Sequence, residues 1–351
     1  MNNTTTIISG SLSSSMQALR LSTTVLGILV YSTGFIGNFL SLLLFIQKEL
    51  RQVSTGLTFL LLNIFSTIHL LSLIVEFVDT VFQVQVIPNA IFRCQFILWL
   101  QNATRTICSF LAATVSLDRF LRSEYPMKSR LWCTKKNVIK LFAIYCFFSV
   151  SFYTFFFHPL NVFNDQGQCS FPIPSTFRLF ALNILPPIRF IIICVLPVII
   201  MVGCGGRMLY NIQQSKKRVI QQPAKTKVDI ATIIPPSSKG SNVTEETRKE
   251  RANIDYMLLL MVLANVAAYI ITQIPFNVYT LYYGYETSDD YTVYSLMRAF
   301  LLMWSSVYFG IGFYLFCITS PQFRKQFITK IKTLCVYQPH PPRGTRLQRA
   351  R

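Results

Sequence analysis

The chain has 351 residues, of which 52% are hydrophobic and 13% are charged, and its formal net charge is +19. Soluble domains carry about 25% charged residues, so this composition excludes an ordinary soluble protein. The apolar residues lie in long blocks, each near the roughly 20 residues with which a helix crosses a bilayer, whereas membrane β-strands are shorter and alternate in polarity. We predict an all-α membrane protein, a bundle of seven transmembrane helices near 25–46, 57–80, 95–117, 138–159, 187–210, 255–282 and 296–319.

Residues 1–24 precede the first predicted helix and are rich in Ser and Thr. The start of this segment, MNNTTTIISGSLSSS, contains no basic residue followed by a long apolar run, so we do not interpret it as a signal peptide. We expect this segment to be disordered and extracellular. Asn2 and Asn3 each begin an Asn-x-Ser/Thr sequon, and both are glycosylation candidates only if the segment lies outside the cell.

Basic residues are distributed unevenly among the connections. Most of the 33 Lys and Arg residues follow the first, third, fifth and seventh predicted helices, at 48–51, 119–140, 207–251 and 324–351. The positive-inside rule places these segments in the cytoplasm and the N-terminus outside, as in a multi-pass plasma-membrane protein. Contact with anionic membrane lipid accounts for the basic excess, so we do not expect nucleic acid as a partner.

Two cytoplasmic segments stand out from the short connections. Residues 211–252 are polar and rich in Pro, Ser and charge, which predicts a long flexible loop. The tail 321–351 begins with an apolar stripe at helical spacing, formed by Phe323, Phe327, Ile331 and Leu334. The stripe predicts a short amphipathic helix on the inner leaflet. Cys335 follows it and is either a palmitoylation site or an unmodified thiol.

Two of the nine cysteines lie outside the apolar blocks on the extracellular side. Cys94 stands at the outer start of the third predicted helix, and Cys169 stands in the loop after the fourth. A disulfide can persist in that oxidising space. Single cysteines inside helices act as small apolar fillers. Since the sequence has no CxxC motif and no Cys/His cluster, we expect neither a metal site nor a cofactor.

A run of short motifs resembles the rhodopsin-like (family A) G-protein-coupled receptors over about residues 25–335. Each motif is weak alone, but their order and spacing across seven predicted helices are specific. The motifs are Gly37-Asn38, Cys94 with Cys169, Asp118-Arg119-Phe120, Pro197, Pro275 and Ser320-Pro321-Gln322-Phe323-Arg324. The segments IPFNVYTLYY and FYLFCITSPQFRKQF are most similar to invertebrate neuropeptide receptors of the FMRFamide type.

The resemblance implies roles for several of these residues. Cys94 and Cys169 would form the family's disulfide. Asp118 would hold Arg119 in an ion pair at rest, with Phe120 in place of the family's tyrosine. On activation the sixth helix moves outward and a heterotrimeric G protein enters, with Pro197 and Pro275 as hinges. Arrestin and receptor kinases are further partners that the family implies.

Several positions depart from the family pattern. Ile68, followed by His69, stands where the family has a sodium-binding acid, so we expect no sodium regulation. Gln273 replaces the aromatic toggle that lies two residues before the proline of the sixth helix. Gly205 replaces a tyrosine of the fifth helix, and the sequence of 312–316 is GFYLF in place of Asn-Pro-x-x-Tyr. These changes affect the activation switch, so ordinary activation does not follow from the resemblance.

Ionisable groups inside membrane helices are costly and mark candidate sites. Gln101 and Arg105 lie four residues apart, on one face of the third predicted helix. With Arg189, Gln273, Arg298 and Glu76 they form the candidate ligand site. Two interpretations of Arg105 stay open. It receives a carboxylate or peptide carbonyl groups, or it pairs internally with Glu76.

The other candidates have alternatives as well. Arg189 and Arg298 either contact the ligand or extend to the membrane surface, and Gln273 bonds either the ligand or backbone near Tyr269. Glu76 or Asp79 would meet a basic ligand residue. Because no acid stands at the third-helix position that amine receptors use, an amine ligand is disfavoured.

The predicted function is therefore a receptor that binds an extracellular ligand, a neuropeptide by preference, and activates G proteins. A chemosensory receptor for environmental small molecules is the alternative. A transporter or channel is remote, because the chain shows no paired repeats with broken helices. We do not expect an enzyme, because His69, His158 and His340 do not cluster with acids or cysteines.

Overall fold

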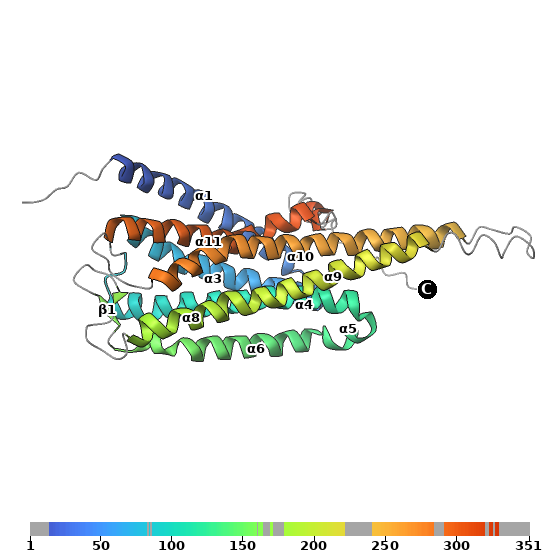
Figure 1. The fold of residues 1–351 in the computed structure, drawn as a ribbon, viewed down its shortest axis with the longest axis horizontal. Coiled ribbons are helices and arrows are strands. Elements are labelled where there is room, and N and C mark those ends of the chain that lie inside the picture. The colour runs from blue at the N-terminus through green and yellow to red at the C-terminus, as the bar shows by residue number, and fades with distance from the viewer. Residues whose placement is uncertain are drawn as a thin grey trace, which may run out of the picture.

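The computed structural model describes residues 14–82, 84, 86–159, 161–163, 169–170, 179–221, 241–283, 291–319, 323–325 and 327–329. Over these ranges the chain is almost entirely helical, and the long helices run side by side (Figure 1). A short antiparallel pair, β1 (Val162–Phe163) with β2 (Cys169–Ser170), joins Val162 to Ser170 and Phe163 to Cys169.

The described helices follow the order of the predicted blocks, with short helical turns between them. A π-helical turn over Ile91–Ile97 leads into α4, and a 3-10 turn over Tyr153–Phe157 follows α6. Two further π-helical turns, Phe180–Ile184 and Ile191–Val195, flank α8. The helices are α1 (Ser14–Phe45), α2 (Lys48–Gln52), α3 (Ser54–Phe82), α4 (Leu98–Glu124), α5 (Pro126–Trp132), α6 (Lys135–Phe152), α8 (Leu185–Phe190), α9 (Leu196–Gln221), α10 (Ser241–Tyr283) and α11 (Tyr291–Thr319).

The bundle has two ends, which we name by their residues. The disulfide end holds Cys94, Cys169 and the β1–β2 pair, and it lies at the left of Figure 1. The Arg119 end holds Asp118, Arg119 and α5, and it lies at the right. Beyond that end α9 and α10 continue past the other helices (Figure 1).

The central helix, α4, differs in composition from its neighbours. Six helical segments of the described chain are long and apolar enough to cross a membrane: α1, α3, α6, α8 with α9, α10 and α11. The polar α4 is not among them, but it packs against α3, α6 and α9, and its residues from Gln101 to Ser109 are all buried. A helix enclosed by protein needs no lipid-facing apolar surface, so α4 completes the predicted seven-helix bundle.

Three helices are longer than their apolar blocks. Residues 14–24 belong to α1, although we predicted them to be disordered. Residues 211–221 belong to α9 and residues 241–252 to α10, although we predicted them to form a flexible loop. An apolar run marks only the thickness of the hydrocarbon core, whereas intrahelical hydrogen bonds continue into polar sequence beyond it.

Each predicted hinge proline leaves one carbonyl of its own helix without the usual donor, because proline has no N–H to reach back four residues. For Pro197 that carbonyl belongs to Ile193, and the Tyr269 hydroxyl of α10 donates to it. For Pro275 it belongs to Ile271, and the Trp304 indole of α11 donates to it at 3.0 Å. These two hydrogen bonds therefore connect the π-helical turn before α9 to α10, and α10 to α11.

Close packing between α1 and α11 depends on glycine. A Cβ added to Gly310 would collide with the Cα of Gly34, so the two backbones touch at this level. A Cβ on Gly312 would meet nothing within 4 Å. Small residues allow this approach in membranes, where helix association depends on packing.

Residues 323–325 and 327–329 are helical and pack against α1 and α11. The Phe323 ring packs against Phe45 at 5.9 Å and Phe316 at 5.6 Å, and Phe327 packs against Phe313 at 5.0 Å. These contacts agree with the first half of the predicted apolar stripe. The rest of it, Ile331 and Leu334, lies outside the described residues, as do Cys335, Asn2 and Asn3.

Candidate functional site

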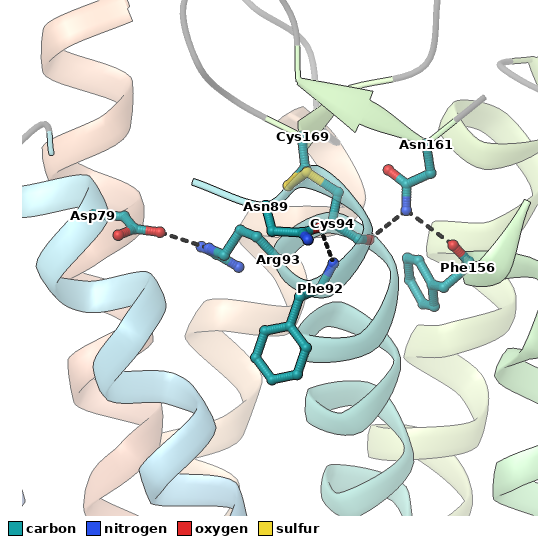
Figure 2. The surroundings of a disulfide bond; sticks show 8 residues. All are labelled: Asp79, Asn89, Phe92, Arg93, Cys94, Phe156, Asn161 and Cys169. Atoms are coloured by element: carbon teal, nitrogen blue, oxygen red, sulfur yellow. Dashed lines mark hydrogen bonds and ion pairs between the residues drawn. A yellow bond between two sulfur atoms is a disulfide. The ribbon is translucent and has the colours of Figure 1, made fainter. Parts of the chain in front are cut away.

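The disulfide end is closed by the predicted bond between Cys94 and Cys169, which is confirmed with Cα atoms 5.2 Å apart (Figure 2). The bond joins β2 to the middle of the π-helical turn that precedes α4. Asn161 reinforces it, because its side-chain amide donates to the Cys94 carbonyl at 2.5 Å and to the Phe156 carbonyl at 3.1 Å. The strand β2, which carries Cys169, is thereby fixed to the π-helical turn before α4.

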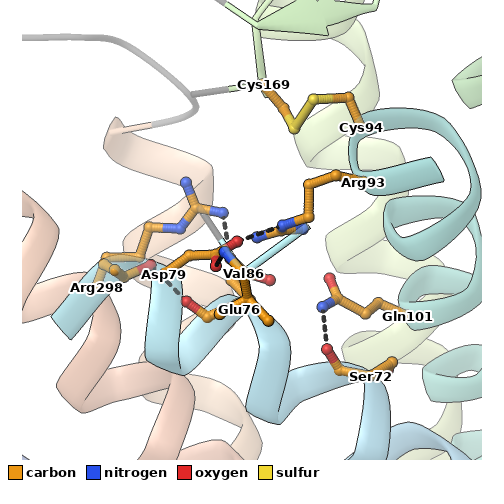
Figure 3. A network of polar contacts seen from close by, with 10 residues as sticks. Ser72, Glu76, Asp79, Val86, Arg93, Cys94, Gln101, Cys169 and Arg298 are labelled. Atoms are coloured by element: carbon orange, nitrogen blue, oxygen red, sulfur yellow. Dashed lines mark hydrogen bonds and ion pairs between the residues drawn. A yellow bond between two sulfur atoms is a disulfide. The ribbon is translucent and has the colours of Figure 1, made fainter. Parts of the chain in front are cut away.

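Arg93 adds an ion pair beside the disulfide that the sequence analysis missed. Its Nε atom lies 2.6 Å from Asp79 Oδ2, and the Val86 backbone N–H donates to Asp79 Oδ1 at 2.9 Å (Figures 2 and 3). We expected Asp79 to be open to a basic ligand residue, and its carboxylate is instead bound by the protein. The sequence feature that could have predicted this ion pair is the position of Arg93 directly before the disulfide cysteine Cys94.

A second ion pair joins α3 to α11. Arg298 Nη2 lies 2.6 Å from Glu76 Oε1, and the Glu76 side chain is only 7% exposed (Figure 3). Both residues were predicted for the site. The internal interpretation named Arg105 as the partner of Glu76, but the ion pair found here is with Arg298. Breaking such a buried pair leaves a charge in low dielectric, so it holds the two helices together.

A cavity lies beneath these ion pairs and brings together five of the six predicted ligand residues. Its polar lining comes from α3, α4, α8 and α11, and consists of Glu76, Gln101, Asn102, Arg105, Arg189 and Arg298. Phe276 of α10 lines it as well. The space open to the centres of water-sized molecules is about 20 Å³, which is room for one or two waters. The lining therefore has three guanidinium groups and one carboxylate around a narrow space.

Arg105 lies at the floor of the cavity and is 3% exposed. Its guanidinium stacks over the Phe276 ring at 4.6 Å and lies 3.4 Å from Ser305 Oγ. Its Nε atom lies 3.5 Å from His69 Nε2, which makes that nitrogen the acceptor. His69 Nδ1 then carries the proton and donates to Thr104 Oγ1 at 2.9 Å. These contacts link α4 to α3, α10 and α11 at one level of the bundle.

The two glutamines have different positions. Gln101 lines the cavity, and its amide donates to the Ser72 carbonyl at 2.9 Å (Figure 3). Gln273 is fully buried away from the lining, and its amide donates to the Ser305 carbonyl at 2.7 Å. Its Oε1 atom has no hydrogen-bond partner in the described part of the chain. Gln273 therefore connects α10 to α11 below the cavity.

At the Arg119 end, Asp118 has a different partner from the one expected. Arg122 Nε donates to Asp118 Oδ2 at 3.0 Å, so the predicted pair with Arg119 is wrong. Helical geometry gives the reason, because residues four apart share a face of α4 while the next residue points about 100° away. Ser54 Oγ donates to Asp118 Oδ1 at 2.8 Å, and the Thr55 hydroxyl donates to Oδ2.

Arg119, the next residue of α4, is partly buried. Its Nε atom is buried and has no hydrogen-bond partner, and no ion pair of Arg119 occurs in the described residues. The Phe120 ring contacts Tyr125 at 6.3 Å, edge to face. The described part of the chain contains no cluster of three His, Cys, Asp or Glu residues placed to hold a metal ion.

Residues 37–308 match the family model of the 7 transmembrane receptor (rhodopsin family). The chain belongs to this family. No curated protein matches it significantly. The receptor is therefore a multi-pass membrane protein of the G-protein-coupled class, a class of signalling receptors rather than enzymes.

Membership of the family agrees with the geometry. One helical bundle contains the predicted disulfide, a buried polar helix α4 and a cavity lined by five predicted ligand residues. The family match covers the segments that supply all six predicted ligand residues and the Asp118-Arg119-Phe120 motif. It does not distinguish a neuropeptide receptor from other members.

Proposed function

We propose that the receptor lies in the plasma membrane with its disulfide end outside, binds an extracellular neuropeptide there, and activates a heterotrimeric G protein at its Arg119 end. The cavity is the observation that carries this proposal. Five residues chosen from sequence line it, and it lies at the opposite end of the bundle from Arg119. The basic segments that follow α4 and α9 support a cytoplasmic Arg119 end.

Charge favours a ligand that offers carboxylate or carbonyl oxygens to the cavity. Both acids of α3 at this end are already bound, Glu76 by Arg298 and Asp79 by Arg93. A cationic ligand group would have to displace one of these arginines. An anionic or carbonyl group meets Arg105 and Arg189 in the lining, and guanidinium binds such oxygens with two parallel hydrogen bonds. Peptides carry these groups in their backbone, acidic side chains and C-terminus.

The small size of the cavity supports one alternative to a neuropeptide ligand. A volume of about 20 Å³ admits a single end group, so a peptide would place one group in the cavity and the remainder outside it. A small environmental acid would place its carboxylate in the same space and leave only a short remainder outside it. A chemosensory receptor for small carboxylates is therefore the second candidate.

Second-messenger response in cells that express the full chain tests the proposal. The ligands are a panel of invertebrate neuropeptides, each as C-terminal acid and amide, and a panel of small carboxylic acids. The Arg119→Ala variant at equal surface level is the coupling control, and Arg189→Gln is the cavity variant. We expect a peptide response that is lost in Arg119→Ala and moves to higher concentration in Arg189→Gln.

Each result has a distinct meaning. A response to small acids alone would replace the neuropeptide by the chemosensory ligand. A peptide response with the same potency in Arg189→Gln would contradict the cavity assignment. A response that persists in Arg119→Ala would contradict the proposed coupling residue.

A further inference from the structure

The short helix α5 and the first turns of α6 carry a strongly basic stretch at the Arg119 end. Residues 125–140 contain no Asp or Glu. They contain five basic residues, all of them exposed: Lys128, Arg130, Lys135, Lys136 and Lys140. Two of these, Lys135 and Lys136, occupy the first turn of α6, where the helix dipole disfavours positive charge. The stability of α6 itself therefore does not account for them.

Large apolar side chains are exposed beside these cations. In the last turn of α5, Leu131 is 73% exposed and Trp132 is 53% exposed. Ser129 of the same helix is buried, so α5 turns a polar residue toward the bundle and its apolar residues away from it. An exposed apolar patch that adjoins polar groups is typical of a surface that contacts a membrane or a partner.

The exposure of α6 indicates that this surface adjoins lipid. The candidate span that begins with α6, Lys135–Phe157, is only 17% buried, the lowest share of the six. Ile144 is 59% exposed and Phe147 is 75% exposed, so both face the hydrocarbon of a membrane. Lys136 and Lys140 precede Ile144 by eight and four residues, which places all of them on one stripe of the helix.

The same stripe gives the depth of the two lysines. With a rise of about 1.5 Å per residue, Lys140 lies about 6 Å and Lys136 about 12 Å from Ile144 along the helix axis. Both stand at the end of the candidate span. Lysine side chains at such positions extend along apolar surface and place the ammonium group among the lipid headgroups.

Hydrogen bonds fix α5 relative to the start of α6. The Asn137 side-chain amide of α6 donates to the Trp132 carbonyl at 2.9 Å, and the Asn137 backbone N–H donates to Thr134 Oγ1 at 3.4 Å. α5 thus stays where the end of α4 meets the start of α6 (Figure 1). Because the turn is already ordered, binding at this surface has a lower cost in conformational entropy.

From these observations we propose that the surface of α5 and the start of α6 binds the phosphate headgroup of an anionic phospholipid. We call it the α5–α6 surface, and it consists of Lys128, Arg130, Leu131, Trp132, Lys136 and Lys140. Its cations contact the phosphate oxygens, and its Leu and Trp side chains enter the membrane interface. The inference rests on the orientation in the proposed function, because anionic phospholipids lie in the cytoplasmic leaflet.

The stripe on α6 favours a lipid over a soluble acidic protein. Lys136 and Lys140 lie on the side of α6 that continues into Ile144 and Phe147. A protein bound only in the cytoplasm cannot follow that side into the hydrocarbon, whereas a phospholipid places its acyl chains along the apolar residues and its phosphate beside the lysines.

Native mass spectrometry of the purified full chain tests the proposal. The receptor is titrated with phosphatidylinositol bisphosphate and with phosphatidylcholine, and the apparent Kd of each is measured. We expect tighter binding of the anionic lipid. Lys136→Gln combined with Lys140→Gln should weaken it about thirtyfold, because each cation near an anionic lipid surface contributes about fivefold.

The matched control is Lys48→Gln combined with Arg51→Gln. It removes two exposed cations of α2 and changes the net charge by the same amount. We expect this variant to keep the affinity of the wild type. Equal losses in the two double variants would show a general effect of charge and would overturn the proposal, as would equal affinity of the wild type for the two lipids.

A second pair of variants distinguishes a membrane lipid from a soluble phosphate. Leu131→Gln combined with Trp132→Gln should weaken binding of phosphatidylinositol bisphosphate, because these side chains contact the lipid interface. Soluble inositol trisphosphate should bind the wild type more weakly than the lipid does. If it binds as tightly, the α5–α6 surface is a site for soluble phosphates and the lipid assignment is wrong.

Signalling assays distinguish a lipid from a protein partner. If the Lys136 and Lys140 double variant binds the lipid like wild type but loses G-protein activation, the surface contacts a protein and the proposal is overturned. The binding measurements require neither a receptor ligand nor a G protein. Lipid binding with the expected variant pattern in a receptor that never signals would therefore support this inference while the proposed function fails.

Discussion

The two ends of the bundle are held together by different interactions. At the disulfide end, Glu76 and Asp79 each pair with an arginine from another segment, and a disulfide joins Cys94 to Cys169 (Figure 3). At the Arg119 end, the ion pair of Asp118 lies within α4, and hydroxyl groups and aromatic rings make the contacts between helices. Ionic and covalent ties fix the helices around the cavity, whereas the Arg119 end keeps more freedom to rearrange.

This difference suits a receptor in which one end recognises and the other responds. A ligand shifts an equilibrium only through its different affinity for two states. A preformed cavity lowers the ordering cost of binding. Weaker ties between helices at the Arg119 end lower the cost of opening that end. This comparison can be tested by removing the strongest interaction between helices at each end and measuring the loss of stability.

The largest effect is expected from the disulfide. Cys94→Ser opens a link that spans 75 residues, and loop-closure entropy assigns about 4.5 kcal/mol to a loop of that length. Surface level and melting temperature should both fall sharply. Cys146→Ser is the matched control, because Cys146 is a free cysteine in α6. If the two variants reached the surface equally, the covalent tie would not be what fixes the disulfide end.

The next effect is expected from the aromatic cluster at the Arg119 end. Phe316 is 5% exposed and contacts Phe45, Phe59 and Phe323. Phe316→Ala should cost about 3 kcal/mol, the lower end for a buried phenylalanine. The melting temperature of the purified receptor measures it. Ile318→Ala is the control on the same helix, because Ile318 is 75% exposed. Equal shifts in both variants would show that rings do not hold this end together.

The fold could be predicted from the sequence because a bilayer leaves few choices. Long apolar blocks indicate helices, and charge asymmetry sets their orientation. α4 was predicted from the block at 95–117, which has the length of a membrane span although polar residues interrupt it. Five of the residues predicted for the ligand site line one cavity, and their burial could be predicted for a related reason. Buried ionisable groups in membrane helices are too costly to be accidental, and Arg105 and Arg189 both lie in the cavity.

The pairing of those ionisable groups could not be predicted. The sequence shows which groups are buried but not the rotation of one helix against another, which decides that Glu76 meets Arg298. Arg122 was overlooked because the family resemblance directed attention to Arg119, although spacing alone favours an i, i+4 pair with Asp118. We predicted Gln273 for the ligand site, but it does not line the cavity, because its amide bonds the Ser305 carbonyl of α11.

The smallest predicted effect is the difference in coupling free energy between the ion pair at the disulfide end and the ion pair at the Arg119 end. A double-mutant cycle of Glu76→Gln and Arg298→Gln should give a coupling of about 1–2 kcal/mol, reduced from a fully buried pair because Arg298 is 30% exposed. The same cycle for Asp118 and Arg122 should give about 0.5 kcal/mol, since Arg122 is 37% exposed and the pair is i, i+4. Melting temperatures of the purified single and double variants supply both values. A larger coupling at Asp118 than at Glu76 would reverse the comparison, because the Arg119 end would then carry the stronger ionic tie and the cavity would be the more adaptable region.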